Sequence, residues 1–367
     1  MKHVIYFIKH NIVMTIAFIA ALITCFLVPP DARYIEYFDF KTLSCLFCVL
    51  AVVCAFKNIN FFYILAKSVV RIFKSARYAI MALVYITFIG SMLIANDMAL
   101  LTFLPLGYFV LTTTGNRKHM AFTFIMQNIA ANLGGMLTPF GNPQNLYLYT
   151  KFAIPNGQFV GIMFLPFIIA IALITLCCFF VENKPLSIEE DIIRLPLWRT
   201  IIYSVLFVLS IAIVFRTVPY YIGLIIIPLV LIFMDRGALK MVDYPLLLTF
   251  VFFFIFSGNL SRLEPVERLF SYLMDKSTLI FSTISCQFIS NVPSAILLSQ
   301  FTQNYPDLLI GVNIGGVGTL ISSLASLITF REYTLHNPGK SLSYIAKFSM
   351  YNFAFLAVLL ISMLVLR

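Results

Sequence analysis

The chain has 367 residues, of which 61% are hydrophobic and only 11% are charged. A soluble protein of this length has about half apolar and about one quarter charged residues, which excludes one large soluble core. The formal net charge of +10 comes from basic residues that lie in short groups between apolar runs, without the continuous stripe that nucleic acid requires. We therefore expect an all-α polytopic membrane protein with no nucleic-acid partner.

Seven apolar runs are interpreted as single membrane-spanning helices, which need about 20 residues each. They are residues 11–29, 39–57, 158–181, 199–216, 219–234, 243–261 and 341–366. Two further apolar stretches, 78–113 and 277–304, carry a polar interruption, and we expect each to form a re-entrant hairpin that enters and leaves on one side. Residues 119–150 and 306–330 have the length of a span but glycine-rich polar centres, which predicts broken helices enclosed by protein.

The distribution of basic residues predicts the orientation. With the N-terminus inside and both hairpins returning to their own side, the chain crosses nine times. This arrangement leaves 17 of the 25 Lys and Arg residues inside, as the positive-inside tendency requires. The chain is thus predicted to be a multi-pass protein of the plasma (inner) membrane, surrounded by the lipid bilayer, with a cytoplasmic N-terminus and an external C-terminus.

An internal repeat is visible in the two broken helices. Residues 131–138 and 312–319 align at an offset of 181, and the asparagine, both glycines and the threonine coincide. We therefore predict a first inverted repeat over 1–181, a linker and connecting helix over 182–218, and a second inverted repeat over 219–367. Two units of opposite orientation, each with a broken helix, are typical of a secondary transporter whose site lies at the repeat interface.

The interruptions supply the candidate binding residues. In the first half they are Asn96, Asp97, Asn132, Thr138, Gly141, Asn142 and Asn145, and in the second half Ser290, Asn291, Ser294, Asn313, Thr319, Ser322 and Ser323. Helix N-termini carry partial positive charge and suit anions, whereas unwound carbonyls and Asn, Ser or Thr oxygens suit Na⁺. For any single residue the alternative is close helix packing, but two repeated pairs of such stretches favour a site.

Asp97 is the only carboxylate between Asp39 and Glu182. An ionisable group within an apolar hairpin is costly unless it is paired or hydrated, so it is a functional candidate by default. The structural alternative is an N-cap for the second arm of the hairpin. The two roles are compatible, and Asp97 is the candidate for ion or proton coupling.

Four segments resemble the ion-transporter superfamily, which includes arsenite permeases, sodium–proton antiporters, divalent-anion sodium symporters and citrate-transporter-like proteins. Residues 94–101 are similar to the first-hairpin signature of arsenite permeases, and residues 132–145 look like the stretch with N-L-G-G and T-P-I-G that the superfamily shares. Residues 290–295 resemble its second-hairpin N-x-P element, and residues 315–323 its G-G-N-G-T run. The four segments occur in the family's order.

The resemblance implies a homodimeric elevator, in which a scaffold holds the dimer while hairpins and broken helices carry the substrate. It places substrate between the hairpin tips, for which the candidates are Asn96, Asp97, Asn142, Pro143, Asn145, Asn291, Val292, Pro293 and Ser294. It implies one Na⁺ site at Asn96, Asn132, Gly141 and Asn142, and a second at Asn291, Asn313, Ser322 and Ser323. The polar centres add Thr138, Ser290 and Thr319 to these sets.

Departures from the family pattern bear on the activity. The symporters' paired Ser-Asn-Thr tips are absent, since residues 95–97 read Ala-Asn-Asp and residues 290–292 read Ser-Asn-Val. Antiporter relatives often have Asp at the positions of Asn142 and Ser290. The leading hypothesis is an ion-coupled secondary transporter for a small anion, a carboxylate or an inorganic oxyanion. The alternatives are a sodium–proton antiporter that uses Asp97, or an arsenite-type efflux permease. We expect no enzyme and no cofactor beyond Na⁺ or H⁺ as coupling ion.

Overall fold

The computed structural model describes residues 11–70, 72–184 and 195–366. Within these ranges the regular structure consists of α-helices and short 3₁₀ helices, with no strand. The prediction of an all-α polytopic membrane protein is confirmed. The predicted cytoplasmic N-terminus and residues 185–194 of the predicted 182–218 linker lie outside the described residues.

The first half contains three short 3₁₀ helices and eight longer helices in the described residues. They are α2 (Ile12–Leu27), η1 (Ala32–Tyr37), α3 (Phe40–Asn58), α4 (Phe61–Val70), α5 (Ala76–Ile94), α6 (Asn96–Thr113), η2 (Arg117–His119), α7 (Met120–Gly134), η3 (Gly135–Leu137), α8 (Pro143–Lys151) and α9 (Asn156–Phe179). We call α5 and α6 the first hairpin, and α7 and α8 the first broken helix.

Two helices, α10 (Leu197–Val214) and α11 (Tyr220–Met234), lead into the second half. It continues with α12 (Arg236–Met241), α13 (Tyr244–Leu260), α14 (Glu264–Ile289), α15 (Asn291–Leu298), α16 (Tyr305–Ile314), α17 (Leu324–His336) and α18 (Ser341–Val365). Ser277 has non-helical dihedral angles and divides α14 into two parts. We call the part after Ser277, together with α15, the second hairpin, and α16 and α17 the second broken helix.

Five helices in the described part of the chain are long and apolar enough to cross a membrane: α3, α5, α9, α10 and α18. The apolar helices α2 and α11 are shorter, and α13 meets α14 at a bend of 100°. Large apolar side chains on the outer faces are exposed, for example Val205 (63%) and Val208 (66%) on α10. An apolar surface of this extent suits contact with lipid, because its exposure to water would be unfavourable.

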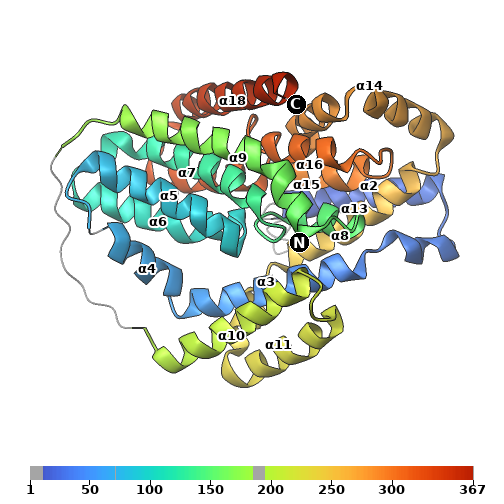
Figure 1. Ribbon diagram of the computed structural model, residues 1–367, viewed down its shortest axis with the longest axis horizontal. Coiled ribbons are helices and arrows are strands. Elements are labelled where there is room, and N and C mark those ends of the chain that lie inside the picture. The colour runs from blue at the N-terminus through green and yellow to red at the C-terminus, as the bar shows by residue number, and fades with distance from the viewer. Residues whose placement is uncertain (1–10, 71, 185–194, 367) are drawn as a thin grey trace.

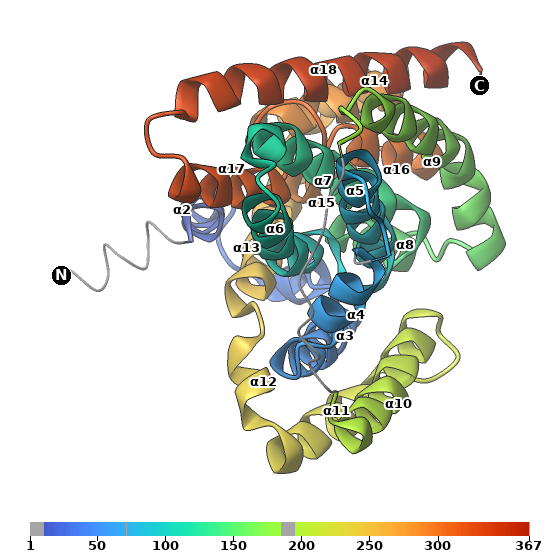
Figure 2. The same cartoon turned by 90° about the vertical axis from the view of Figure 1, so that its left-hand side faces the viewer.

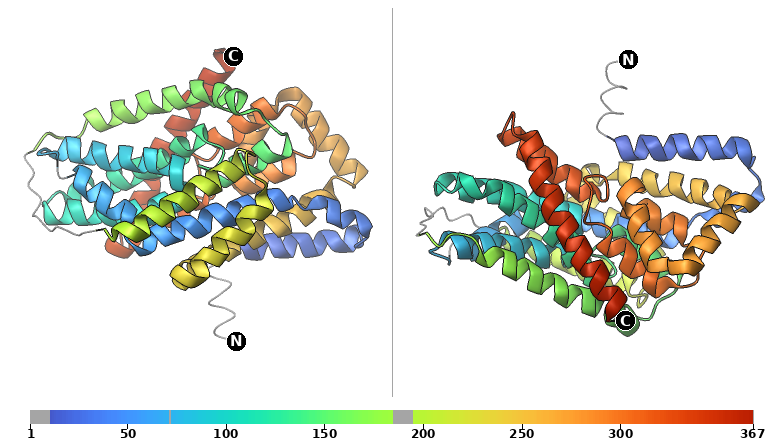
Figure 3. Two further views of the ribbon diagram at one scale, coloured as in Figure 1. Left: turned by 60° about the horizontal axis from the view of Figure 1, so that its bottom comes forward. Right: turned by 90° about the horizontal axis from the view of Figure 1, so that it is seen from above.

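The helices stack in layers across the molecule. Figure 1 shows α18 along one side and α10 and α11 along the opposite side, with the hairpins and broken helices between them. Figure 2 shows the same order after a quarter turn. In Figure 3, α10 and α11 lie in front of α3 (left), and α18 crosses the other helices obliquely (right). The helix pair with the most extensive contact is α2 with α13, which pack side by side.

An aspartate caps the N-terminus of α3 in the first half, and another caps the N-terminus of α13 in the second half. The Asp39 carboxylate accepts the backbone N–H of Thr42 (2.9 Å) at the start of α3, and the Asp243 carboxylate accepts that of Leu246 (2.9 Å) at the start of α13. Each cap satisfies an amide that the helix itself leaves unpaired. The cap on α13 also leaves a partly buried carboxylate at the start of that helix.

Candidate substrate and ion site

The two hairpins turn through residues with nearly the same backbone conformation. Ala95 joins α5 to α6 with φ 67° and ψ 152°, and Ser290 joins α14 to α15 with φ 75° and ψ 160°. A positive φ is uncommon for a residue with a side chain and costs about 1–3 kcal/mol, so it persists only where neighbouring contacts impose it.

The tip asparagines supply those contacts in the same way on both sides. The Asn96 N–H donates to the Gly141 carbonyl oxygen (3.2 Å), and the Asn291 N–H donates to the Ser322 carbonyl oxygen (2.9 Å). Each asparagine side-chain oxygen also accepts the N–H of the following residue at 2.9 Å. Both tips are therefore pinned to the unwound centre of the broken helix that follows in the chain.

A threonine ties each broken helix to the first arm of its hairpin. Thr138 Oγ1 donates to the Met92 carbonyl oxygen (2.8 Å), and Thr319 Oγ1 donates to the Gln287 carbonyl oxygen (3.0 Å). Each accepting residue lies four positions before the tip asparagine. The two halves thus use equivalent contacts to hold a hairpin against a broken helix.

Buried amides connect the two halves through Asn132. Its side-chain oxygen accepts from Asn96 Nδ2 (3.2 Å) in the first hairpin and from Ser323 Oγ (2.8 Å) in the second broken helix. All three residues are at most 3% exposed. A buried network of this kind fixes the relative position of its members, because a lost partner would leave a polar group unsatisfied.

The first and second broken helices also meet through their asparagines. Asn142 Nδ2 donates to Asn313 Oδ1 (3.2 Å), and Asn313 Nδ2 donates to Asn145 Oδ1 (2.6 Å). Asn145 Nδ2 in turn donates to carbonyl oxygens of the unwound segment, including that of Gly135 (3.1 Å). The unwound backbone of the first half is thus held by an amide from its own broken helix.

Among the buried oxygens that have no hydrogen-bond partner within the described residues, three belong to this site: Asp97 Oδ1, Asn142 Oδ1 and Gln144 Oε1. Oxygens also crowd around Gly135, where an added Cβ would lie 2.4 Å from Asn142 Oδ1 and 2.7 Å from the Gly141 carbonyl oxygen. Neutral carbonyl and amide oxygens, with a carboxylate nearby, are a donor set that suits a hard cation. The residues present therefore fit a small cation such as Na⁺ in the first half.

The corresponding set in the second half has a different bonding pattern. Ser322 Oγ donates to the carbonyl oxygens of Gly316 (2.9 Å) and Thr319 (2.8 Å). Its hydroxyl hydrogen is thus engaged within the turn, and Ser323 Oγ is engaged with the first half. The second set offers hydroxyl and carbonyl oxygens but no carboxylate.

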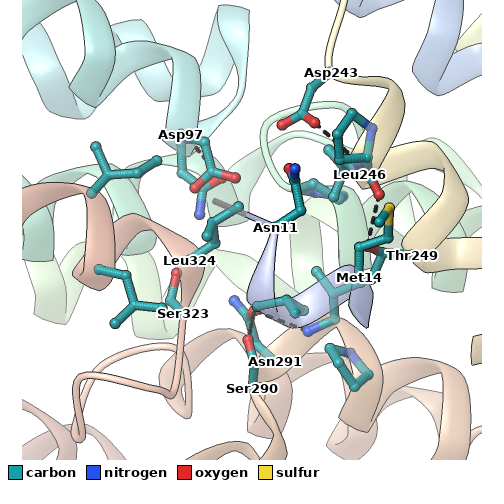
Figure 4. A pocket seen from close by; sticks show the side chains of 18 of the residues that line it. Asn11, Met14, Asp97, Asp243, Leu246, Thr249, Ser290, Asn291, Ser323 and Leu324 are labelled. Atoms are coloured by element: carbon teal, nitrogen blue, oxygen red, sulfur yellow. Dashed lines mark hydrogen bonds between the residues drawn. The ribbon is translucent and has the colours of Figure 1, made fainter. Parts of the chain in front are cut away.

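A cavity of about 550 Å³ lies between the two hairpin tips. Figure 4 shows Asp97 and Asp243 near one another on one side of it, with Ser290 and Asn291 on the other. Its walls come from α2, both hairpins, α8, α13 and α17. Residues from both halves of the chain therefore face one space.

The predicted residues divide into two groups by their position. Those that line the cavity are Asn96, Asp97, Pro143, Ser290, Asn291, Val292, Pro293 and Ser323. The others, which do not line it, are Asn132, Thr138, Gly141, Asn142, Asn145, Ser294, Asn313, Thr319 and Ser322. Most of this second group belongs to the buried contacts just described, behind the cavity wall.

Several cavity residues were not predicted from the sequence. Asp243 and Arg331 both line it, and so do Asn11, Gln144 and Thr249. In the sequence, Asp243 stands at the start of an apolar helix and is interpreted as an ordinary N-cap. Arg331 is interpreted as one of the basic residues on the inner side of the membrane. The sequence signal that could have indicated Gln144 is its position between two predicted residues, Pro143 and Asn145.

Six helices in the described residues begin at the cavity: α2, α6, α8, α13, α15 and α17. The first residues of each, or the residue that caps it, line the wall. Helix N-termini point unpaired amides and a partial positive charge at what lies in front of them. Arg331 adds a full positive charge to the same space. The cavity is therefore suited to an anion despite its two carboxylates.

A membrane-embedded cavity enclosed by two hairpins and two broken helices defines a secondary transporter. The chain belongs to the citrate transporter family, whose model matches residues 4–308.

Two relatives support the same class. An uncharacterized transporter of Methanocaldococcus jannaschii is 32% identical over 294 residues, which covers 80% of this chain and 81% of the relative. The inner membrane protein YbiR of Escherichia coli is 30% identical over 289 residues, 74% of each chain. The protein is thus an integral membrane transporter, as predicted.

Proposed function

We propose that this protein is an ion-coupled secondary active transporter that moves a small anion, a carboxylate or an inorganic oxyanion, across the membrane. The observation that carries the proposal is the single cavity shared by both hairpin tips. Discontinuous helices that end near the middle of the membrane are the usual substrate and ion sites of secondary transporters.

The anion would lie between Asn96 and Asn291, in front of the first turns of α6 and α15. There the partial positive charge at the N-terminal ends of the two helices would attract it. Arg331 would attract it at the exposed edge of the cavity.

The coupling ion would be Na⁺ or H⁺. The unpaired oxygens of Asn142 and Gln144 and the nearby Gly141 carbonyl would bind Na⁺, and the unpaired Asp97 Oδ1 would take up a proton or face the cation. Either ion would offset the charge of the anion, so that the two bind more favourably together than apart. No other cofactor and no catalytic residue enters the proposal.

Transport would proceed by an elevator-type movement of both hairpins and both broken helices within a homodimer. Buried side-chain hydrogen bonds join the first hairpin to the two broken helices, and the backbone bond from Asn291 to Ser322 joins the second hairpin to its broken helix. These contacts support motion of the four elements as one body. In the predicted orientation, Asn11, Asp243 and Arg331 lie toward the cytoplasmic side. The cavity they line would then be the inward-facing site.

A second candidate function is sodium–proton antiport. It is favoured by one specific observation, the unpaired buried oxygen of Asp97 in a cavity that also contains Asp243. In that case the two carboxylates would carry the exchanged cation, and no anion would move.

Reconstituted proteoliposomes distinguish the two functions. Uptake of labelled carboxylates and oxyanions is measured with an inward Na⁺ gradient, an inward H⁺ gradient and neither. We expect anion uptake that one gradient accelerates and that collapses with it. Gradient-driven Na⁺–H⁺ exchange with no anion flux would instead establish antiport.

The Gly161→Ala variant provides a matched control for reconstitution. An added Cβ at Gly161 meets no atom within 4 Å, so its flux should equal that of the wild type. Absence of gradient-dependent flux for every anion, in wild type and control alike, would overturn the proposed function.

A further inference from the structure

We propose that the transported anion is a monocarboxylate with an apolar body, whose apolar end enters a side pocket behind the two carboxylates. This inference rests on the proposed function and specifies the substrate of the same cavity. It is carried by the shape, lining and charge of the site.

The side pocket is small, about 50 Å³, and directly adjoins the main cavity. The two spaces share five lining residues: Asp97, Pro143, Asp243, Leu246 and Ile328. Apart from the two aspartates, every residue that lines the side pocket is apolar. An apolar recess of this size has room for a group of a few non-hydrogen atoms and offers water too few polar partners.

Helix α3 supplies the floor of this recess with Leu46, Val49 and Leu50, each at most 5% exposed. Met98 and Leu101 contribute from the first hairpin. The recess therefore lies between the hairpin tip and a neighbouring helix, where a bound alkyl group would contact both. Burial of each methylene group there would strengthen binding by about fourfold.

The main cavity continues the apolar surface on the side of the second half. Val292 and Pro293 at the second tip, Leu246 on α13, and Leu324 and Leu327 on α17 all line it. An inorganic oxyanion or a small hydrophilic acid would leave this surface unfilled within about 550 Å³. Ligand sites combine a mostly apolar wall with a few polar groups that orient the ligand, and an acid with an apolar body matches both.

The charge of the cavity argues against a substrate with several carboxylates. Asp97 and Asp243 bring two formal negative charges and Arg331 one positive charge, which leaves one net negative charge in the space. One coupling cation cancels that charge, and a second cation or the helix N-termini can then balance one carboxylate. Each additional carboxylate would face the aspartates without a fixed partner, and like charges in a low-dielectric site repel strongly.

The experiment measures competition on the full-length protein in proteoliposomes. Uptake of labelled acetate, butyrate, hexanoate, citrate and sulfate is first measured for each anion alone. Uptake of labelled hexanoate is then competed by each of the five unlabelled anions. We expect the inhibition constant to fall by about fourfold per methylene group along the series, with citrate and sulfate at least about a hundredfold weaker than hexanoate.

Two variants of one residue place the apolar end in the recess. Val49→Phe fills it and should weaken hexanoate far more than acetate. Val49→Ala enlarges it and should move the optimum to a longer chain, so that the assignment stays testable if the larger side chain prevents folding. Val205→Phe, on the exposed face of α10, is the control and should leave the series unchanged.

The outcomes separate the inference from the proposed function. Transport of citrate or sulfate in preference to hexanoate overturns the inference and leaves anion transport intact. If neither Val49 variant changes the inhibition constants along the chain-length series, the inference is also overturned. Absence of flux for all five anions overturns anion transport itself, and with it this assignment.

Discussion

The tips of the two hairpins share a backbone and differ in chemistry. Asn96 and Asn291 make the same pair of contacts, but the next residue is Asp97 in the first hairpin and Val292 in the second. Both of these residues line the cavity. The asparagine therefore has the structural role, because it holds the tip in place. The residue that follows it determines the chemistry of that side of the cavity.

A second difference concerns what holds the unwound segments. In the second half, Gln287 Nε2 donates to the Gly315 carbonyl oxygen (2.9 Å), and its Oε1 accepts the Thr319 N–H (2.9 Å). The residue in the same place in the first hairpin is Met92, which can do neither, and Asn145 performs that role from the broken helix itself. The second half is therefore tied to its hairpin more directly.

The largest expected effect follows from the glycines of the broken helices. A Cβ on Gly134 would lie 2.2 Å from the Phe88 backbone oxygen, whereas a Cβ on Gly315 would lie 2.7 Å from the Gly311 backbone oxygen and 2.9 Å from the Cys286 side chain. The contact at Gly134 is the shorter one and comes from a neighbouring helix, α5, so Gly134→Ala should cost about 3 kcal/mol or more and Gly315→Ala about 1–2 kcal/mol. Thermal unfolding midpoints in detergent measure the difference.

Gly161→Ala is the matched control, because its Cβ meets nothing within 4 Å. Its unfolding midpoint should stay at the wild-type value. Equal losses for Gly134→Ala and Gly315→Ala would show that the two halves pack equally tightly, contrary to the comparison.

The next effect concerns the hydrogen bonds of Gln287 that hold the second half together. Gln287→Met gives the second hairpin the residue of the first and leaves the partly buried Thr319 N–H without its acceptor. An unsatisfied buried group costs about 1–3 kcal/mol, so the unfolding midpoint should fall clearly. Met92→Leu, at the same place in the first hairpin, should cost less than about 1.5 kcal/mol. A smaller loss for Gln287→Met than for Met92→Leu would refute the assignment.

The third prediction separates the two tips by function. Asp97→Asn keeps the shape of the first tip but removes its charge, so gradient-driven uptake should fall by about tenfold or more, equivalent to about 1.4 kcal/mol. Exchange of labelled for unlabelled anion without a gradient should be less affected. Val292→Asn is the counterpart and should retain the dependence on the gradient. Equal loss of coupling in both variants would contradict a one-sided carboxylate.

Much of this architecture follows from local sequence pattern. The helix breaks at Ala95 and Ser290 lie where polar residues interrupt apolar runs, because such residues can leave a helix only where protein satisfies them. The shared Asn, Gly and Thr of the two broken helices also serve equivalent contacts, since each depends on a residue nearby in its own half.

The composition of the cavity wall does not follow from pattern. Asp243 and Arg331 are distant in sequence from the first tip and reach the cavity only because α13 and α17 pack beside it. Their local surroundings give each an ordinary explanation, as a cap and as an inner basic residue. Likewise, no spacing shows that α3 supplies the floor of an apolar recess, since Leu46 and Val49 occur within a uniformly apolar helix.

The smallest effect concerns the bends that precede the two hairpins. At the bend between α13 and α14, the Arg262 guanidinium donates to both Asp31 oxygens (3.1 and 2.7 Å), whereas at the bend between α3 and α4 the neutral amide of Asn58 contacts Asp235 (3.0 Å). Arg262 lowers the pKa of Asp31 through these hydrogen bonds, against a smaller opposing effect of burial.

A carboxyl with a lowered folded-state pKa stabilises the protein above its unfolded pKa of about 3.9, and this contribution is lost as the pH falls through the lowered value. Asp31→Asn should therefore reduce the unfolding midpoint slightly at pH 7, and the difference from wild type should shrink below about pH 4. The Asp31–Arg262 pair is partly exposed, so high salt should also reduce the difference in unfolding midpoint between Asp31→Asn and wild type. A difference that stays constant from pH 7 to about pH 3 would mean that the charge of Asp31 does not stabilise this bend.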